Sequence, residues 1–298
     1  MTKRIIEISG FDASLSVRCG QVIVKRGGEL AGQFPAEDVG LLIVDTPMAS
    51  FSNATLIKMI DTGGLVILCG DNHLPAAFVV PMEGNTLQTQ RLALQLTVTL
   101  PRHKRLWQKI VRTKIRNQAA ACLDDAVRKR LDNLAAHVAS GDTSNTEGQA
   151  SRFYWAVYLQ GETFLRDREG APPNHFLNYG YMILRAAMAR AICGAGLNPS
   201  LGIHHHNRAN GFCLADDLIE PFRPWVDLAT HKLHLLAKTE LDKQAKAALI
   251  GVIHEKCVSE NQTTSIETAI DRAVASLCHC YEGETDKLSL PAMAYKSG

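Results

Sequence analysis

The run Val39-Gly-Leu-Leu-Ile-Val44 decides the first part of the fold, because a short and almost wholly apolar segment is typical of a buried β-strand. Gly64-Leu-Val-Ile-Leu-Cys69 is a second run of this kind. Arg4–Ser9 alternates between polar and apolar residues, and Gln21–Lys25 precedes a glycine turn, so both are also predicted strands. Ser52–Asp61 has the apolar spacing of a short helix. We therefore expect a small, mainly β domain at the start of the chain.

From about Leu92 onward the apolar residues recur with a helical period, and the segments become long. The segments that suit helices are Arg105–Leu123, Ala126–His137, Gly148–Leu159, Asn178–Cys193 and Asp227–Val258. The expected fold class is α+β, a small N-terminal β domain followed by a larger all-α C-terminal domain. The polar stretch Pro81–Gln90 is the expected junction, and we place the domains at residues 1–83 and 92–298, joined by a linker at 84–91.

Composition limits the class of protein. The 298 residues are 46% hydrophobic and 21% charged, with a net charge of +2, which is ordinary for a globular protein. The first residues lack the apolar core of a secretory signal, and no apolar run is long enough for a membrane span. The eight cysteines are scattered rather than spaced as a disulfide framework or zinc ribbon. We expect a cytoplasmic protein with no membrane partner.

One stretch is strongly basic. Between Glu83 and Asp124 the chain has eight lysines and arginines and no acidic residue. On a helix, Arg105, Lys109, Arg112 and Arg116 lie on one side and form a cationic stripe. Such a stripe could follow a nucleic acid backbone, but charge runs are also common on solvated helix faces. From this stretch alone the two interpretations stay balanced.

A candidate metal site lies in the stretch that starts Gly202-Ile-His-His-His206 and continues to Asp216, Asp217 and Glu220. On a helix the last three residues are close neighbours, so their charges repel unless a cation or a basic partner compensates them. Carboxylates with one imidazole suit Mg²⁺ or Mn²⁺ better than zinc. The acidic residues could instead be helix-terminal acids, and Glu220 precedes a proline that could simply end the helix.

A further carboxylate must come from elsewhere, and Glu147 is the candidate. It begins a predicted helix, in Thr146-Glu-Gly-Gln-Ala-Ser-Arg-Phe-Tyr154. However, Ser144-Asn-Thr-Glu147 is also a capping-box pattern, in which the glutamate would bond the cap amide. Spacing alone favours the cap.

Three motifs taken together resemble the CRISPR spacer-acquisition integrase family. They are Glu147-Gly-x-Ala-x-Arg-x-Tyr, then Gly202-Ile-His-His, then Leu214-Ala-Asp-Asp-Leu-Ile-Glu-Pro-Phe-Arg-Pro224. Leu106–Gln118 and Phe34–Val44 are similar to the family as well, so the resemblance covers about residues 4 to 230. The His-His-His-Asn and Glu-Pro-Phe-Arg-Pro stretches are similar to its type II branch.

The resemblance implies metal ligands and catalytic residues at Glu147, His205 and Glu220. The family's glycine-apolar-apolar-histidine pattern selects His205, which leaves His204 at a normally apolar position and His206 after it. Asp217 matches a position that is often acidic, and we take it as a supporting carboxylate. The implied cofactor is Mg²⁺ or Mn²⁺.

The resemblance also implies an activity and an assembly. The activity is metal-dependent cutting of DNA and insertion of short captured DNA (spacers) into a CRISPR array, through attack of a 3′-hydroxyl on a phosphodiester. The partners would be double-stranded DNA (captured spacer DNA and the CRISPR repeat), a second copy paired through the β domain, and a small ferredoxin-like acquisition protein in a heterohexamer. The type II effector nuclease is a further expected partner.

Two other functions fit parts of the sequence. A DNA-capture scaffold without catalysis would bind duplex ends with a steep salt dependence. A metal-dependent hydrolase of small phosphate compounds would use the same ligands, but it leaves the basic stretch unexplained.

Overall fold

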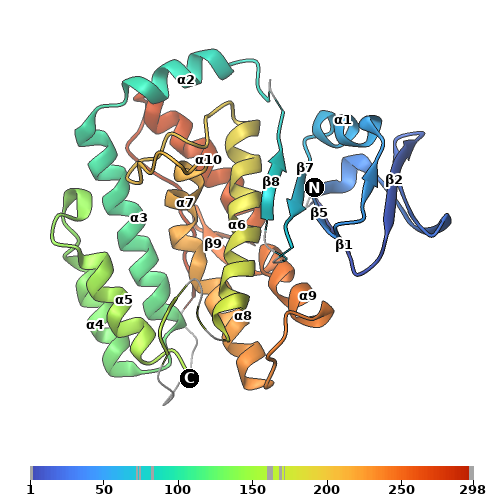
Figure 1. Cartoon of the computed structure of the whole chain (residues 1–298). Helices are drawn as coiled ribbons and strands as arrows, with labels where there is room; N and C mark the ends of the chain where they lie inside the picture. Colours follow the sequence, from blue (N-terminus) through green and yellow to red (C-terminus); the bar gives the residue numbers. More distant parts are fainter. Residues whose placement is uncertain are drawn as a thin grey trace. The chain divides into compact units, whose positions relative to one another are not determined.

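The computed structural model describes residues 3–71, 73, 75–81, 84–159, 164–167, 170 and 172–294. The chain divides into two compact units. The first is Met1–Thr89 with Ala189–Leu197, and the second is Gln90–Met188 with Asn198–Gly298. Figure 1 shows the strands of the first unit in blue to cyan and the helices of the second from green to red. The boundaries 1–83, 84–91 and 92–298, and the pairing role of the first domain, stay predictions.

The first unit contains two four-stranded sheets. In one sheet the order is β1-β5-β7-β8, where β1, β5 and β7 are parallel and β8 is antiparallel to β7. In the other the order is β4-β3-β2-β6. The bounds are β1 Arg4–Ser9, β2 Ala13–Arg18, β3 Gln21–Arg26, β4 Glu29–Pro35, a 3₁₀ turn at Ala36–Asp38, β5 Val39–Asp45, β6 Ser50–Phe51, α1 Asn53–Asp61, β7 Leu65–Cys69 and β8 Pro75–Val79.

The apolar run Val39–Val44 lies in the inner strand β5. Every residue of β5 is buried, and β1 and β7 flank the strand on its two edges. Leu15, Val22 and Met59 belong to the same core as Leu42 of β5. The four strands and the helix expected from the sequence are confirmed to within a residue or two at each end, and β2, β4, β6 and β8 were not predicted.

The second unit is mainly helical. Its elements are α2 Gln88–Thr97, α3 Leu100–Ala121, α4 Asp125–Ala136, a 3₁₀ turn at Ser140–Asp142, α5 Thr146–Ala156, α6 Asn174–Gly194, α7 Cys213–Ile219, a 3₁₀ turn η3 at Glu220–Phe222, α8 Arg223–Leu235, α9 Lys243–Gly251, a 3₁₀ turn at Val252–His254, β9 Lys256–Ser259, β10 Gln262–Ser265 and α10 Ile266–Glu282. The last few residues of α6 belong to the first unit. The helix α3 contacts α4, α5, α7, η3 and α8, and Figure 1 shows it running beside α4 and α5.

The predicted helix Asp227–Val258 is wrong. It divides into α8, α9 and the strand β9, which pairs with β10 in an antiparallel hairpin. The first helix ends where Ala237 takes a positive φ of 53°, and a new helix starts at Asp242, whose side chain accepts a hydrogen bond from the Ala245 amide at 2.8 Å. The cap at Asp242 is a local signal that the continuous apolar spacing concealed.

The expected fold class is confirmed: a β-rich N-terminal part precedes a largely helical part, which carries one short hairpin. In the part of the chain that the structure describes, no helix has both the length and the hydrophobicity needed to cross a bilayer.

Candidate metal centre

Glu147 lies in the first turn of α5, and other residues cap that helix. Asn145 accepts a hydrogen bond from the Gly148 amide at 3.2 Å, and the two oxygens of Asp142 accept from the Thr146 and Glu147 amides at 2.8 and 3.0 Å. The Glu147 side chain is therefore not needed as a cap, and its Oε1 lies 2.5 Å from Lys114 Nζ on α3. The capping-box alternative is wrong for this residue.

Glu220 is the first residue of η3, between α7 and α8, and its side chain is buried. Asn117 of α3 fixes this turn by donating a hydrogen bond to the Pro221 carbonyl oxygen at 2.7 Å. Glu220 Oε2 lies 2.6 Å from Lys114 Nζ, and Oε1 lies 2.9 Å from an Arg223 nitrogen. The same lysine thus contacts both carboxylates of the predicted ligand set.

The two cations offset the cost of burying Glu220. Burial alone would raise the pKa of Glu220, but Arg223 and Lys114 outweigh it and hold the pKa below its usual value. Burial would lower the pKa of Lys114, yet Glu220 and Glu147 raise it. Glu220 is therefore ionised and Lys114 is charged at neutral pH.

His205 is held in place by Asp217. The imidazole Nδ1 lies 2.5 Å from Asp217 Oδ1, and Asp217 also accepts hydrogen bonds from the amides of Ile203 and His204 at 2.6 and 2.8 Å. Gly202 permits this tight loop, because a Cβ there would clash with the His205 carbonyl oxygen. Asp217 itself is completely buried, so the loop closes over a carboxylate.

The contact with Asp217 sets the chemistry of His205. The hydrogen bond that the imidazole donates to Asp217 raises the pKa of His205, burial opposes this, and the charges of Asp217, Glu220 and Glu147 add to the rise. Because Nδ1 is engaged by a carboxylate, Nε2 is the nitrogen that remains to bind a cation. Pairs of this kind orient metal-binding histidines in many proteins.

The other two histidines have different surroundings. The His204 ring stacks on Trp107 of α3, with 4.3 Å between the ring centroids and 3° between the planes. His205 meets the same indole edge-on at 5.6 Å. His206 is exposed. Trp107 is buried beneath the loop and supports both His204 and His205.

The acidic cluster expected from the sequence is divided among separate partners. Asp216 pairs with Arg185 of α6 at 2.8 Å and accepts a hydrogen bond from Asn210 at 2.6 Å. A cavity of about 390 Å³ lies beside the centre, lined among others by Arg185, Arg223, His205 and Glu220. It is an open, polar space next to two of the three predicted ligands.

Sequence reasoning missed Lys114 as a site residue. It was counted among the basic residues of α3, but it does not lie on the stripe that starts at Arg105. It follows Trp107 and Val111 on the buried face of α3, at helical spacing. A lysine inside an apolar stripe was the available signal, because buried lysines are rare without a partner.

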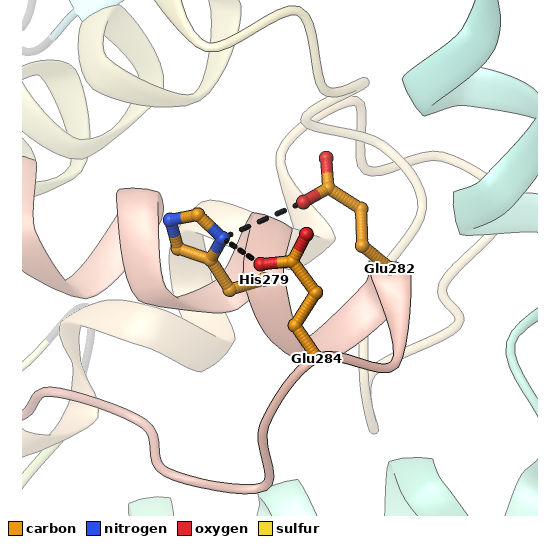
Figure 2. A group of neighbouring side chains, drawn as sticks. All are labelled: His279, Glu282 and Glu284. Carbon is orange, nitrogen blue, oxygen red and sulfur yellow. Dashed lines mark hydrogen bonds and ion pairs between the residues drawn. The ribbon is translucent and has the colours of Figure 1, made fainter.

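A second group of metal-binding side chains lies at the C-terminal end of α10 (Figure 2). Ligand atoms of His279, Glu282 and Glu284 all lie within 4.8 Å of one another, so the group could hold a cation. His279 and Glu284 are exposed, Glu282 is partly buried, and the three already interact: His279 Nδ1 lies 2.7 Å from a Glu284 oxygen and 3.5 Å from a Glu282 oxygen. Glu282 also lies 3.8 Å from Arg91. None of these residues is among the predicted ligands.

A buried tyrosine network lies behind the centre. Tyr154 and Tyr181 donate hydrogen bonds to the two carboxylate oxygens of Asp227, and Tyr158 donates to its carbonyl oxygen at 2.8 Å. Burial raises the pKa of Asp227 to about 6, although the hydrogen bonds from Tyr181 and Tyr154 lower it.

This raised pKa predicts a pH-dependent stability. The folded state favours the protonated form of Asp227. The contribution of this side chain to the free energy of unfolding is therefore complete below pH about 4 and is lost as pH rises through about 6. A shift of about two units is worth about 3 kcal/mol. The unfolding free energy of Asp227→Asn, relative to wild type, should therefore rise by about that amount between pH 4 and pH 7. Urea unfolding at several pH values measures this difference in unfolding free energy.

Asp125→Asn, at an exposed aspartate, is the control and should show no such rise. If the unfolding free energy of Asp227→Asn relative to wild type did not change with pH, the raised pKa of Asp227 would be contradicted.

Comparison with known proteins gives the family. Residues 6–252 match the family model described as CRISPR associated protein Cas1. The chain is 37% identical over 278 residues to the CRISPR-associated endonuclease Cas1 of Neisseria meningitidis serogroup C (strain 8013), covering 92% of this chain and 90% of that protein.

Two solved structures have the same fold. A casposase bound to an integration product matches with a TM-score of 0.74 at 18% identity, covering 96% of this chain and 92% of that one. A chain of a Cas6-RT-Cas1–Cas2 complex matches with a TM-score of 0.77 at 15% identity, covering all of this chain and 36% of that longer one. The resemblance expected from the three motifs is confirmed, and the chain belongs to the Cas1 family of CRISPR-associated proteins.

Proposed function

We propose that this protein is a metal-dependent DNA endonuclease and integrase of CRISPR adaptation, with Glu147, His205 and Glu220 as catalytic residues and metal ligands. One observation carries the proposal: Glu147 and Glu220, from distant parts of the sequence, both contact Lys114, and the charges of both glutamates act on His205. The name of the Neisseria relative and the casposase fold support it. The match to the Neisseria protein also supports the type II-like branch.

The residues fit a divalent cation. Two carboxylates and one imidazole form a hard donor set that suits Mg²⁺ or Mn²⁺. Glu220 Oε2 is buried and has no well-oriented hydrogen bond from any described residue, although Lys114 Nζ is near it. A buried carboxylate oxygen in that condition is available to a cation. When bound, the cation would supply Lewis-acid stabilisation of the charge that develops on the phosphate.

The reaction follows from these contacts. The 3′-oxygen of the captured DNA attacks phosphorus and loses its proton, while the bond from phosphorus to the 3′-oxygen of the target strand breaks and that oxygen gains a proton. One phosphodiester replaces another, so no cofactor is consumed. Asp217 keeps the imidazole of His205 oriented, and Arg223 holds Glu220 in place beside the open cavity. With water in place of the hydroxyl, the same centre would cut DNA.

The basic stripe of α3 would contact the DNA backbone. Arg116 is exposed and Arg105 is half-exposed. At its N-terminal end the stripe is partly balanced, because Lys109 donates to the Asp286 carbonyl oxygen and Arg105 lies 4.0 Å from the Asp286 carboxylate. The part nearest Arg116 is therefore the better candidate for phosphate contact.

The proposed partners are double-stranded DNA, a second copy of this chain paired through the β-rich domain, and the small ferredoxin-like acquisition protein. The last of these is supported by the likeness in fold to a chain of the Cas6-RT-Cas1–Cas2 complex, because that assembly joins Cas1 to a second protein, Cas2. The type II effector nuclease is proposed as a further partner, and the protein is proposed to act in the cytoplasm.

The test is strand transfer into a supercoiled plasmid that carries a CRISPR repeat. We expect a labelled duplex with 3′-hydroxyl ends to join the plasmid in Mn²⁺ or Mg²⁺, and to join less than a hundredth as well in EDTA. A duplex with 3′-deoxy ends should bind equally but not join, because the nucleophile is missing. Joining in EDTA, or joining of the deoxy duplex, would overturn the proposed chemistry.

The alternative is a DNA-capture scaffold without catalysis. It predicts binding of duplex ends that weakens steeply with salt, and no joining in any cation. The meeting of Glu147 and Glu220 at Lys114 favours the enzyme, since a scaffold has no need of two carboxylates from distant segments that contact one buried lysine.

A further inference from the structure

Lys114 lies where two predicted metal ligands meet. It is in α3, its side chain is 9% exposed, and its Nζ is 2.5 Å from Glu147 Oε1 and 2.6 Å from Glu220 Oε2. The carboxylates come from α5 and η3, which are far apart in sequence. Lys114 is the contact that these two side chains share.

We propose that Lys114 is a positioning residue that occupies the cation position and holds Glu147 and Glu220 together until the metal arrives. This inference rests on the proposed function. Glu220 is buried and Glu147 is partly buried, so two carboxylates this near each other repel, and a cation between them removes the repulsion. The ammonium group of Lys114 supplies that cation within the chain.

The contact with Glu220 is suited to exchange. Arg223 holds Oε1 of Glu220 at 2.9 Å, while Oε2 faces Lys114 without a well-oriented hydrogen bond. One oxygen of Glu220 therefore pairs with Arg223, outside the two carboxylates and the lysine, and the other oxygen pairs with Lys114 alone at 2.6 Å. Displacement of the ammonium leaves Glu220 in place, with Oε2 free to bind the metal.

A lysine that occupies the cation position, as proposed for Lys114, has two opposite effects. It stabilises the metal-free protein, because it offsets the charge of the carboxylates. It also weakens metal binding, because a divalent cation must displace or tolerate the ammonium. A residue that only supported the fold would act differently: its loss would disturb the ligands and weaken metal binding.

The experiment compares the whole protein with its Lys114→Met variant, without DNA. Isothermal titration with Mn²⁺ should show binding at least about tenfold tighter in the variant, because a competing positive charge is gone. In EDTA the variant should melt at a lower temperature than wild type, and Mn²⁺ should raise its melting temperature by more than it raises that of wild type. Lys129→Met, a variant at an exposed lysine of α4, should match wild type in both measurements.

Two further variants keep the outcomes distinct. Lys114→Gln removes the charge but keeps a hydrogen-bond donor. If Lys114→Met does not fold, the Mn²⁺ affinity of Lys114→Gln tests the proposal instead. Glu220→Ala tests the metal site itself. If Glu220→Ala binds Mn²⁺ as wild type does, the proposed metal site is wrong. If Glu220→Ala binds weakly but both Lys114 variants bind with wild-type affinity or less, only the role of Lys114 is overturned.

Discussion

Glu220→Ala should lose strand transfer by at least about a thousandfold in Mn²⁺, which corresponds to about 4 kcal/mol of lost transition-state stabilisation. The substitution removes the buried carboxylate that Lys114 and Arg223 both contact. A centre with one carboxylate fewer holds the cation less firmly and offsets less of the charge on the reacting phosphate. The measurement is half-site joining of a labelled duplex to a repeat-bearing plasmid.

The control for this variant separates chemistry from folding. Glu220→Ala removes a partner from the buried Lys114 and from Arg223, so its melting temperature must be recorded beside its activity. Its affinity for duplex DNA should stay near that of wild type, because Glu220 is buried and lies off the basic stripe. Glu240→Ala, at an exposed glutamate of the same unit, should join DNA as wild type does. If Glu220→Ala joined DNA as well as wild type does, the assignment of Glu220 to the catalytic site would be wrong.

Asp217→Asn should weaken Mn²⁺ binding by about ten- to a hundredfold and lower strand transfer by a similar factor. Asp217 accepts from the amides of Ile203 and His204 and engages His205 Nδ1. An asparagine retains one acceptor oxygen, so either the imidazole or the amides lose their partner. The imidazole would then no longer be fixed with Nε2 toward the cation.

Two measurements check this prediction. Titration with Mn²⁺ gives the affinity, and saturating Mn²⁺ should restore part of the joining activity, since the ligands themselves remain. Asp216→Asn is the matched control, because the neighbouring carboxylate pairs with Arg185 rather than with the histidine. Equal losses of Mn²⁺ affinity and joining activity in the two variants would mean that Asp217 supports the helix rather than the histidine.

The fold was predictable from sequence where the pattern was strong. The strand Val39–Asp45 is buried on both faces, and its unbroken apolar run indicated it. The strand Glu29–Pro35 was missed because it lies at a sheet edge and is mostly exposed, so it carries no apolar run. The prediction of a single helix over Asp227–Val258 was wrong for a related reason. Apolar residues continue at helical spacing through the turn after Leu235, and this spacing gives no sign that Ala237 adopts a left-handed conformation, which ends the helix.

The site was predictable only in part. Local reasoning favoured a capping role for Glu147, and the structure shows Asn145 and Asp142 in that role instead. The ligand set of Glu147, His205 and Glu220 stays a prediction, although the two glutamates meet at one lysine and their charges act on His205. Lys114 could not be assigned from spacing, because its two partners come from segments that only tertiary packing brings together.

The helix α3 carries three things at once: Trp107 under the histidine loop, Lys114 between the carboxylates, and the basic stripe on its outer side. Trp107 and Lys114 are about two helical turns apart, so they point the same way. Inserting one residue between them would rotate one against the other by about 100° and separate the histidine from the glutamates. The geometry of the centre therefore depends on the spacing between Trp107 and Lys114 along this helix. Members of the family should keep the same number of residues between these two positions.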